Sequence, residues 1–343
     1  MPQPNHLFIV ADSAAPPPTP DASLITEFCA QADVAVTTRH KYRVQLGEFS
    51  LWLTHPMTRR AGGHALLTDV TKADVARFMA YLMSGERYAA SKHALRGGPL
   101  AASTRKSYLA SLKALYRYLM SVDLATFDPT DSIARPKVKL KPGLRLTPEE
   151  LKKLLAAPGN ARDRAQVCLL AFTAARTNEI RCLRWQDIDF TEATMLVHGK
   201  NDSWRMIHIH PKLIRELRLW QLAQTARAKR SAPLAYALAD PETAYVLLTR
   251  SGKQLAHSAM SKQLKLRAIR AGLHIYEHDD GEERSRVTPH ALRRTFATIL
   301  LNQGHHLDAV ADVLGHRSVD TTRNHYAFAS DARKRATMEA FDV

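Results

Sequence analysis

The sequence predicts a two-domain, mainly α-helical protein with a small antiparallel β-sheet in the second domain. Its 343 residues exceed the usual length of one domain, and 45% of them are apolar, which is enough to build a core in each of two. Apolar residues recur at helical spacing over residues 21–132. Two short strand-like runs flank the turn Gly-Lys-Asn-Asp at 199–202, which predicts a β-hairpin.

The first domain, residues 21–132, is expected to contain four helices. The first begins after Asp21, and the second follows the Thr-Thr pair at 37–38. The third starts at Thr71, where Thr71 and Asp74 have the spacing of a capping box. The fourth starts at Thr104 and carries the clearest apolar stripe of the domain. Residues 1–20, with six prolines, predict a flexible arm before these helices.

The charge of the chain indicates a polyanionic partner. Forty-nine Lys and Arg residues oppose 33 Asp and Glu, which leaves a formal net charge of +16. Proteins this basic usually bind nucleic acid. Lys106, Lys113 and Arg117 share one face of the fourth helix, so that face is a candidate DNA-binding surface. A solvated helix surface is the alternative interpretation, and the sequence alone leaves both open.

Residues 133–146 predict a basic linker between the domains, because their prolines prevent a continuous helix. The segment carries four cations that could follow a DNA backbone, namely Arg135, Lys137, Lys139 and Lys141. A plain linker explains the composition nearly as well. A second domain, residues 147–343, then begins with a strong helix start in which Thr147 precedes Pro148 and Glu150.

Within the second domain we expect a helix over 163–175 and a shorter one that ends near Arg184. The hairpin strands are expected at 195–197 and 206–209, and a third strand at 245–248 is expected to complete the sheet. The pattern after this strand is helical to the end of the chain. Three widely spaced cysteines support neither a disulfide framework nor a zinc site.

The groups needed to act on a phosphodiester are dense between residues 288 and 326. Such a reaction needs a nucleophile, cations for the non-bridging oxygens and an acid for the leaving oxygen. His290 and Arg293 lie three residues apart, so both project from one face of a predicted helix. A Leu-Gly pair ends another predicted helix directly before His316, and Tyr326 follows ten residues later.

These motifs, HxxR, LGH and TTxxxY, resemble the tyrosine recombinase (phage integrase) family. Upstream, the run AARTNEI, which contains Arg176 and Glu179, resembles the first arginine block of that family, and Lys200 resembles its catalytic β-turn lysine. The blocks occur in the family's order and cover about 150–329. One departure is the interval from His316 to Tyr326, which is ten residues here and nine in many members.

The resemblance implies a helical SAM-like core-binding domain, similar by pattern to residues 21–125, followed by an α+β catalytic domain. It implies that Tyr326 attacks the DNA phosphate, that Arg176 and Arg293 bind the non-bridging oxygens, and that Lys200 protonates the leaving 5′-oxygen. His290 would assist proton movement, and His316 would hydrogen-bond a non-bridging oxygen. Glu179 more plausibly orients Arg176 than reacts.

The resemblance also implies partners: double-stranded DNA with specific recombination sites, and a homotetramer in the synaptic complex. No metal or ATP is required. No run of 18 apolar residues occurs, so we expect no membrane partner. The three cysteines fit a reducing cytosol, and we expect a cytoplasmic, nucleoid-associated protein. The tail, residues 331–343, is expected to dock on a neighbouring protomer.

Integration or excision of a mobile element is the first expectation for the biological role. Xer-type dimer resolution, type IB topoisomerase activity and a non-catalytic DNA-binding role are the alternatives.

Overall fold

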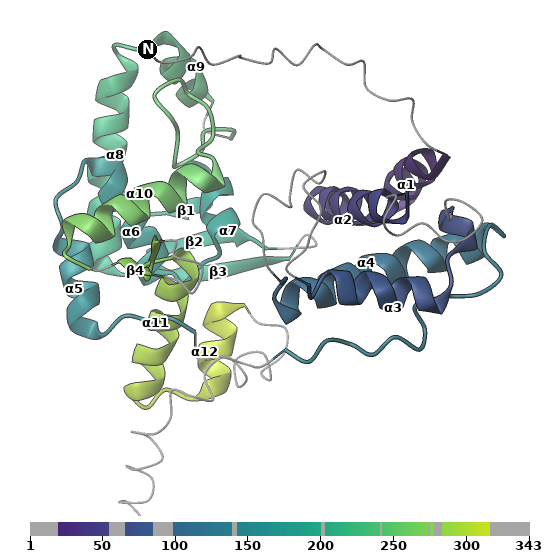
Figure 1. The fold of residues 1–343 in the computed structure, drawn as a ribbon. Helices are drawn as coiled ribbons and strands as arrows, with labels where there is room; N and C mark the ends of the chain where they lie inside the picture. The colour runs from purple at the N-terminus through teal and green to yellow at the C-terminus, as the bar shows by residue number, and fades with distance from the viewer. Residues whose placement is uncertain are drawn as a thin grey trace, which may run out of the picture. The chain divides into compact units, whose positions relative to one another are not determined.

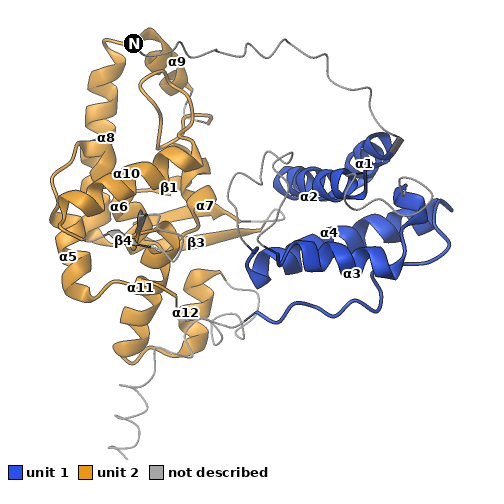
Figure 2. Ribbon diagram, viewed as in Figure 1, with its two compact units in different colours: residues 1–140 blue, residues 141–343 orange. Residues whose placement is uncertain are grey.

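A computed structural model describes residues 20–54, 66–84, 99–138, 143–199, 203–240, 242–273, 275–277 and 283–315 of the chain. The chain divides into two compact units, residues 1–140 (unit 1) and 141–343 (unit 2), coloured separately in Figure 2. The structure is mainly helical, with a three-stranded antiparallel sheet in unit 2, which confirms the predicted fold class. In the described ranges, no helix combines the length and apolar character needed to cross a membrane.

Unit 1 is a helical bundle in its described part (Figure 1). Its helices are α1 (Pro20–Gln31), α2 (Val36–Thr54), α3 (Lys72–Tyr81) and α4 (Ala102–Ser121), with a short 3-10 turn at Leu67–Asp69. Aromatic side chains from different helices meet in the core, where the Phe49 and Phe78 rings pack edge to face with centroids 4.8 Å apart. The apolar stripe of α4 is buried against this core, as its spacing predicts.

Unit 2 builds a small sheet among helices (Figure 1). Its helices are α5 (Pro148–Ala156), α6 (Ala161–Phe172), α7 (Thr177–Cys182), α8 (Pro211–Ala228), α9 (Ala232–Ala239), α10 (His257–Arg270), α11 (Pro289–Asn302) and α12 (Leu307–Leu314), with a 3-10 turn at Trp185–Asp187. Its strands are β1 (Ile188–Asp189), β2 (Thr194–His198) and β3 (Trp204–His208), in the order β1-β2-β3, and the separate pair β4 (Ile275–Glu277) and β5 (Glu283–Ser285).

In the described part of unit 2, two apolar clusters hold the helices and the sheet together. The larger one joins α6 to α8, α10 and α11 and to the inner face of the sheet, with Leu169 and Leu217 fully buried. The smaller one packs α11 against α12 and includes Ala174 from the loop after α6. This smaller cluster positions the candidate site, because it fixes the C-terminal end of α12 against the loop that leads into α7.

Local cap chemistry decided where several helices begin and end. Thr71 and Asp74 form the predicted capping box of α3, and Thr147 and Glu150 form that of α5. Gly315 ends α12 in a left-handed conformation, with φ of 65°. These three sequence predictions are confirmed.

Four predictions about elements were wrong. The run 245–248 forms no strand, because Tyr245 makes only an isolated bridge to Arg184, and the third strand of the sheet is β1 instead. The region after it is not wholly helical, since β4 and β5 pair as a hairpin. Helix α6 ends at Phe172 rather than at 175, because the chain turns into a left-handed conformation at Ala174. Helix α2 starts at Val36, so the Thr-Thr pair at 37–38 lies inside the helix.

Candidate active site

The loop between α6 and α7 delivers Arg176 to the start of a helix. The Thr173 hydroxyl donates to the Leu169 carbonyl and accepts from the Ala175 amide, which closes α6. Ala174 then adopts φ of 49°, a conformation that costs a non-glycine residue about 1–2 kcal/mol. Its methyl group is fully buried in the smaller apolar cluster, which stabilises this turn. Arg176 follows as the N-cap residue of α7.

Glu179 orients Arg176 by binding both its main chain and its side chain. The Arg176 amide donates to Oε2 of Glu179 at 2.7 Å, and the Arg176 guanidinium donates to Oε1 at 2.8 Å. The carboxylate is 3% exposed, whereas the Arg176 side chain is 42% exposed. Glu179 therefore fixes the orientation of Arg176, and the exposed part of the Arg176 side chain can still contact a ligand. These are the contacts that the expected orienting role of Glu179 requires.

The carboxylate of Glu179 also accepts a bidentate hydrogen bond from Arg205 on β3. The two guanidinium nitrogens of Arg205 lie 3.0 and 2.9 Å from the two carboxylate oxygens. Burial alone would raise the pKa of Glu179, but the hydrogen bonds from Arg205 and Arg176 outweigh it and hold the pKa below its usual value. Glu179 is thus an ionised group shared by two arginines. Arg205 was not among the residues predicted for the site.

Arg293 approaches the same place from α11. It is 6% exposed, and its guanidinium donates to the Ala174 carbonyl at 2.5 Å and to the Leu314 carbonyl. The Arg176 guanidinium lies 3.4 Å from the next carbonyl along the chain, that of Gly315. Two arginines that are 117 positions apart in the sequence therefore converge on consecutive carbonyls at the end of α12. The negative end of a helix dipole also favours cations at this position.

His290 lies one turn before Arg293, in the first turn of α11, and its side chain is exposed. Desolvation lowers the pKa of its imidazole below the ordinary 6.5, and the charges of Arg294, Arg293, His257 and Arg176 lower it further. The ring is therefore neutral at pH 7 and can accept a proton or a hydrogen bond.

The other predicted site residues divide into described and undescribed ones. Lys200, His316 and Tyr326 lie outside the described residues, as do Lys139 and Lys141 of the linker. Within unit 1, Lys106 and Arg117 are exposed and Lys113 is half-buried on α4. Arg135 and Lys137 are exposed after α4. The part of the chain that the structure describes holds no group of three or more His, Cys, Asp or Glu residues arranged to bind a metal ion.

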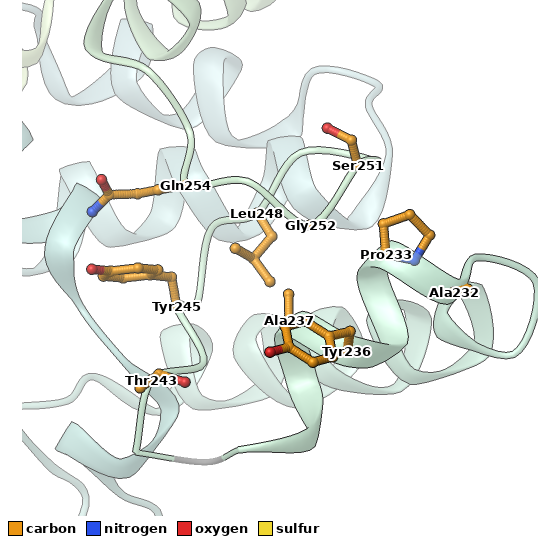
Figure 3. Close-up of a pocket in the computed structure, with 10 residues that line it drawn as sticks. All are labelled: Ala232, Pro233, Tyr236, Ala237, Thr243, Tyr245, Leu248, Ser251, Gly252 and Gln254. Carbon is orange, nitrogen blue, oxygen red and sulfur yellow. The ribbon is translucent and has the colours of Figure 1, made fainter.

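A hollow beside α9 is a poor candidate for the phosphate site. Figure 3 shows its lining, which is largely apolar and carries no charged side chain. The ten lining residues are Ala232, Pro233, Tyr236, Ala237, Thr243, Tyr245, Leu248, Ser251, Gly252 and Gln254. A DNA phosphate needs cationic or hydrogen-bond donors, which gather at α7, α11 and the end of α12 instead.

Comparisons with known proteins show the family of the chain. The model of the phage integrase family matches residues 144–333, which is more than half of the chain. The tyrosine recombinase XerC of Roseiflexus sp. (strain RS-1) is 30% identical over 311 residues, covering 88% of this chain and 88% of that protein.

Solved structures show the same fold at lower identity. The XerH site-specific recombinase bound to difH substrate, in a pre-cleavage complex, is 21% identical with a TM-score of 0.64, covering 94% of this chain and 84% of that chain. The Tn1549 transposon integrase in complex with transposon right end DNA is 18% identical with a TM-score of 0.62, covering 93% and 98%.

The mainly helical fold brings two arginines, Arg176 and Arg293, together at the C-terminal end of α12. The family match identifies the chain: it belongs to the phage integrase family, the tyrosine recombinases. It is accordingly an enzyme that cleaves and rejoins DNA.

Proposed function

We propose that this enzyme is a site-specific recombinase that cuts and rejoins duplex DNA through a covalent bond between Tyr326 and the DNA 3′ end. The convergence of Arg176 and Arg293 on the carbonyls of Leu314 and Gly315 carries the proposal. These two carbonyls directly precede His316 in the sequence, and His316 lies ten residues before the proposed nucleophile.

The two arginines have distinct parts in the proposed chemistry. In the pentavalent transition state, negative charge accumulates on the non-bridging oxygens of the phosphate. Arg176 is oriented by Glu179 and partly exposed, so its planar fork is available to those oxygens. Arg293 is mostly buried and bonded to two main-chain carbonyls, so it both fixes the end of α12 and adds a cation to the site. Loss of one preorganised donor typically costs about 10²- to 10³-fold in rate.

The remaining residues would move protons. The Tyr326 oxygen attacks phosphorus, a bond to the 5′-oxygen breaks, and Lys200 protonates that leaving oxygen. The neutral imidazole of His290 assists proton movement at the tyrosine or the phosphate, and His316 donates to a non-bridging oxygen. Attack by a 5′-hydroxyl reverses these steps. One phosphoester bond replaces another in each direction, so the cycle requires no ATP, and no metal is assigned a role.

A nicked suicide substrate tests the nucleophile. Cleavage near a nick releases a short oligonucleotide, which diffuses away and leaves the enzyme attached to the DNA 3′ end. The wild-type enzyme should accumulate this adduct, and Tyr326→Phe should form none. Tyr236→Phe is a matched control, because Tyr236 is 86% exposed on α9 and contributes nothing to the proposed site. An adduct formed by Tyr326→Phe would refute the assignment.

DNA contacts are proposed on both units. In unit 1 the basic face of α4 (Lys106, Lys113 and Arg117) would bind phosphates, since its opposite face is buried in the core. The linker cations Arg135, Lys137, Lys139 and Lys141 would follow the backbone towards unit 2. The proposed functional assembly is a homotetramer bound to two recombination sites, and the proposed location is the DNA of the cytoplasm.

Integration or excision of a mobile element remains the first proposal for the biological role. The similarity in fold to the Tn1549 transposon integrase is compatible with it. Xer-type dimer resolution is the second candidate, favoured by the XerC of Roseiflexus sp. and by the other relatives of that name. The DNA that flanks the gene discriminates them, because an adjacent attachment-like repeat indicates an integrase. Relaxation of supercoils without sequence preference would favour a topoisomerase instead.

A further inference from the structure

Arg205 is a third arginine beside Arg176 and Arg293, and its guanidinium is mostly buried. It lies on β3 opposite Val197, and its side chain is 16% exposed. Its two terminal nitrogens bind the two oxygens of Glu179, while its Nε is buried and makes no hydrogen bond within the described residues. The orientation of Arg205 is therefore set by Glu179, the same carboxylate that orients Arg176.

Sharing one carboxylate couples the two arginines. Glu179 is 3% exposed, so its ionised form depends on the cations that bind it. With Arg205 in place, both oxygens are fixed, and Arg176 can use Oε1 without turning the carboxylate. Without Arg205, only the amide and the guanidinium of Arg176 would bind the buried carboxylate, so its charge would draw the Arg176 guanidinium inwards, away from a phosphate.

Arg205 also packs against the end of α12. A Cβ placed on Gly315 would lie 2.9 Å from Cδ of Arg205 and 3.0 Å from one of its terminal nitrogens. This glycine supplies the carbonyl nearest to Arg176 and directly precedes His316 in the sequence. Arg205 is also near Lys200 in the sequence. Strand β3 begins one residue before Arg205, and the connection between β2 and β3 contains Lys200. One side chain thus joins α7, the hairpin and the end of α12.

We infer that Arg205 is a positioning residue for DNA cleavage: through Glu179 it fixes Arg176, and it packs against Gly315 at the end of α12. This inference rests on the proposed function. Arg205 itself is bound to Glu179 rather than presented to DNA, so its loss should slow the chemical step and leave DNA binding intact. A displacement of about 1 Å at a reacting group can lower a rate about 100-fold.

Single-turnover cleavage of a nicked substrate, with the full-length enzyme in excess, separates these effects. We expect Arg205→Met to cleave about 100-fold more slowly than the wild type while its Kd for the intact site stays within about twofold. Arg205→Lys keeps the charge but cannot form the bidentate pair, so it should recover only part of the rate. If Arg205→Met does not fold, Arg205→Lys carries the test, with an expected loss of about tenfold.

Arg164→Met is a matched control for the general cost of removing an arginine from a carboxylate. Arg164 binds Glu216 at 3.1 Å between α6 and α8, and Glu216 is 10% exposed on its side chain. Neither residue belongs to the proposed site. Arg164→Met should therefore keep the wild-type cleavage rate once the concentration of folded protein is matched by circular dichroism.

A double-mutant cycle shows whether Arg205 acts through Glu179. If it does, Glu179→Gln combined with Arg205→Met should be no slower than the slower single variant, because both changes disturb the same group. If each single variant lost about 100-fold independently, the losses would multiply to about 10⁴-fold. Three results would each overturn the inference. The losses of the two single variants could multiply in the double variant, or Arg205→Met could cleave within about threefold of the wild-type rate. The third is a loss of cleavage rate that is explained by a loss of DNA binding. A wild-type enzyme that forms no 3′ adduct would instead contradict the proposed function.

Discussion

Gly315 is under two separate constraints, and a substitution can measure both. Its φ of 65° is unfavourable for any residue with a Cβ, and its missing Cβ makes room for Arg205, which Glu179 holds in place. We expect Gly315→Ala to lower the free energy of unfolding by about 1–2 kcal/mol for the backbone conformation alone. The crowding of Arg205 should add about 1–3 kcal/mol. Urea unfolding of the full chain measures the sum.

Gly272 provides the control for this prediction. Its φ is 67°, nearly the same, but a Cβ placed on it would meet nothing within 4 Å. Gly272→Ala should therefore show the backbone cost without the crowding cost. Equal destabilisation by the two substitutions would mean that Arg205 moves away freely, contrary to its fixed geometry.

The lowered pKa of His290 gives a pH dependence with a definite sign. Because partial desolvation and the surrounding cations lower the pKa of His290, the protonated fraction becomes large only when the pH falls through a value below 6.5. If the neutral imidazole assists proton movement, the cleavage rate should be level above pH 6.5 and fall in acid. His290→Asn should cleave more slowly and lose this acid limb. An unchanged limb in the variant would assign the titration to another group.

Single residues also show where sequence reasoning stops. Arg176, His290 and Arg293 could be predicted because their motifs are short and contiguous. Arg205 could not, because its partner Glu179 is 26 positions away and only the fold brings the Arg205 side chain of β3 to α7. An arginine at the start of a strand has no local pattern that separates a buried ion pair from a solvated side chain.

Among the secondary-structure elements, α4 carries the prediction that is easiest to isolate. One face is buried in the core of unit 1, so neutralising the exposed cations on its other face should spare stability. We expect Lys106→Ala with Arg117→Ala to weaken binding of all DNA sequences alike. The slope of log K against log salt should become shallower by about 0.9 for each DNA phosphate that the variant no longer neutralises. Binding titrations at several salt concentrations measure this slope.

Lys41→Ala on α2 is the comparison, since Lys41 is also exposed in unit 1 but lies outside the proposed surface. It should change the slope little. If both variants behave alike, the cations of α4 are ordinary surface charges, which was the alternative interpretation of the sequence.

The elements differ in how far local chemistry specifies them. The capping boxes at Thr71 and Thr147 were predictable because a helix start is encoded within four residues. The run at 245–248 has strand-like residues, yet Val246 and Leu247 are buried in the main core of unit 2 without a strand partner. Its residue pattern indicates burial, and burial alone does not decide pairing. The two-residue strand β1 was missed because its pairing with β2 is set by the sheet and not by its own sequence.

For the whole enzyme, the proposed reaction predicts rejoining without an energy source. The covalent adduct retains the energy of the broken phosphodiester, so a strand with a free 5′-hydroxyl should displace the tyrosine. We expect the trapped complex to join an added complementary 5′-hydroxyl strand in buffer that contains EDTA and no ATP. The yield of joined strand on a denaturing gel is the measurement, and a 5′-phosphorylated strand, which lacks the attacking hydroxyl, should not be joined. A requirement for a divalent metal would contradict the proposed mechanism.

Recombination demands more than cleavage, because several protomers must act on two sites together. Residues 331–343 lie outside the described residues, and their sequence, with Met338 and Phe341 as apolar members, predicts a segment that docks on a neighbouring protomer. The described core of unit 2 and the arginine cluster are formed by residues before this segment.

Deleting 331–343 should therefore leave single-site DNA binding within about twofold, while recombination between two sites falls steeply because docking energy is removed only from the assembly. Gel-shift titration on one site and a two-site recombination assay separate the outcomes. Recombination at the wild-type rate would show that the assembly does not depend on the tail, whereas loss of single-site binding would place the segment in the DNA interface instead.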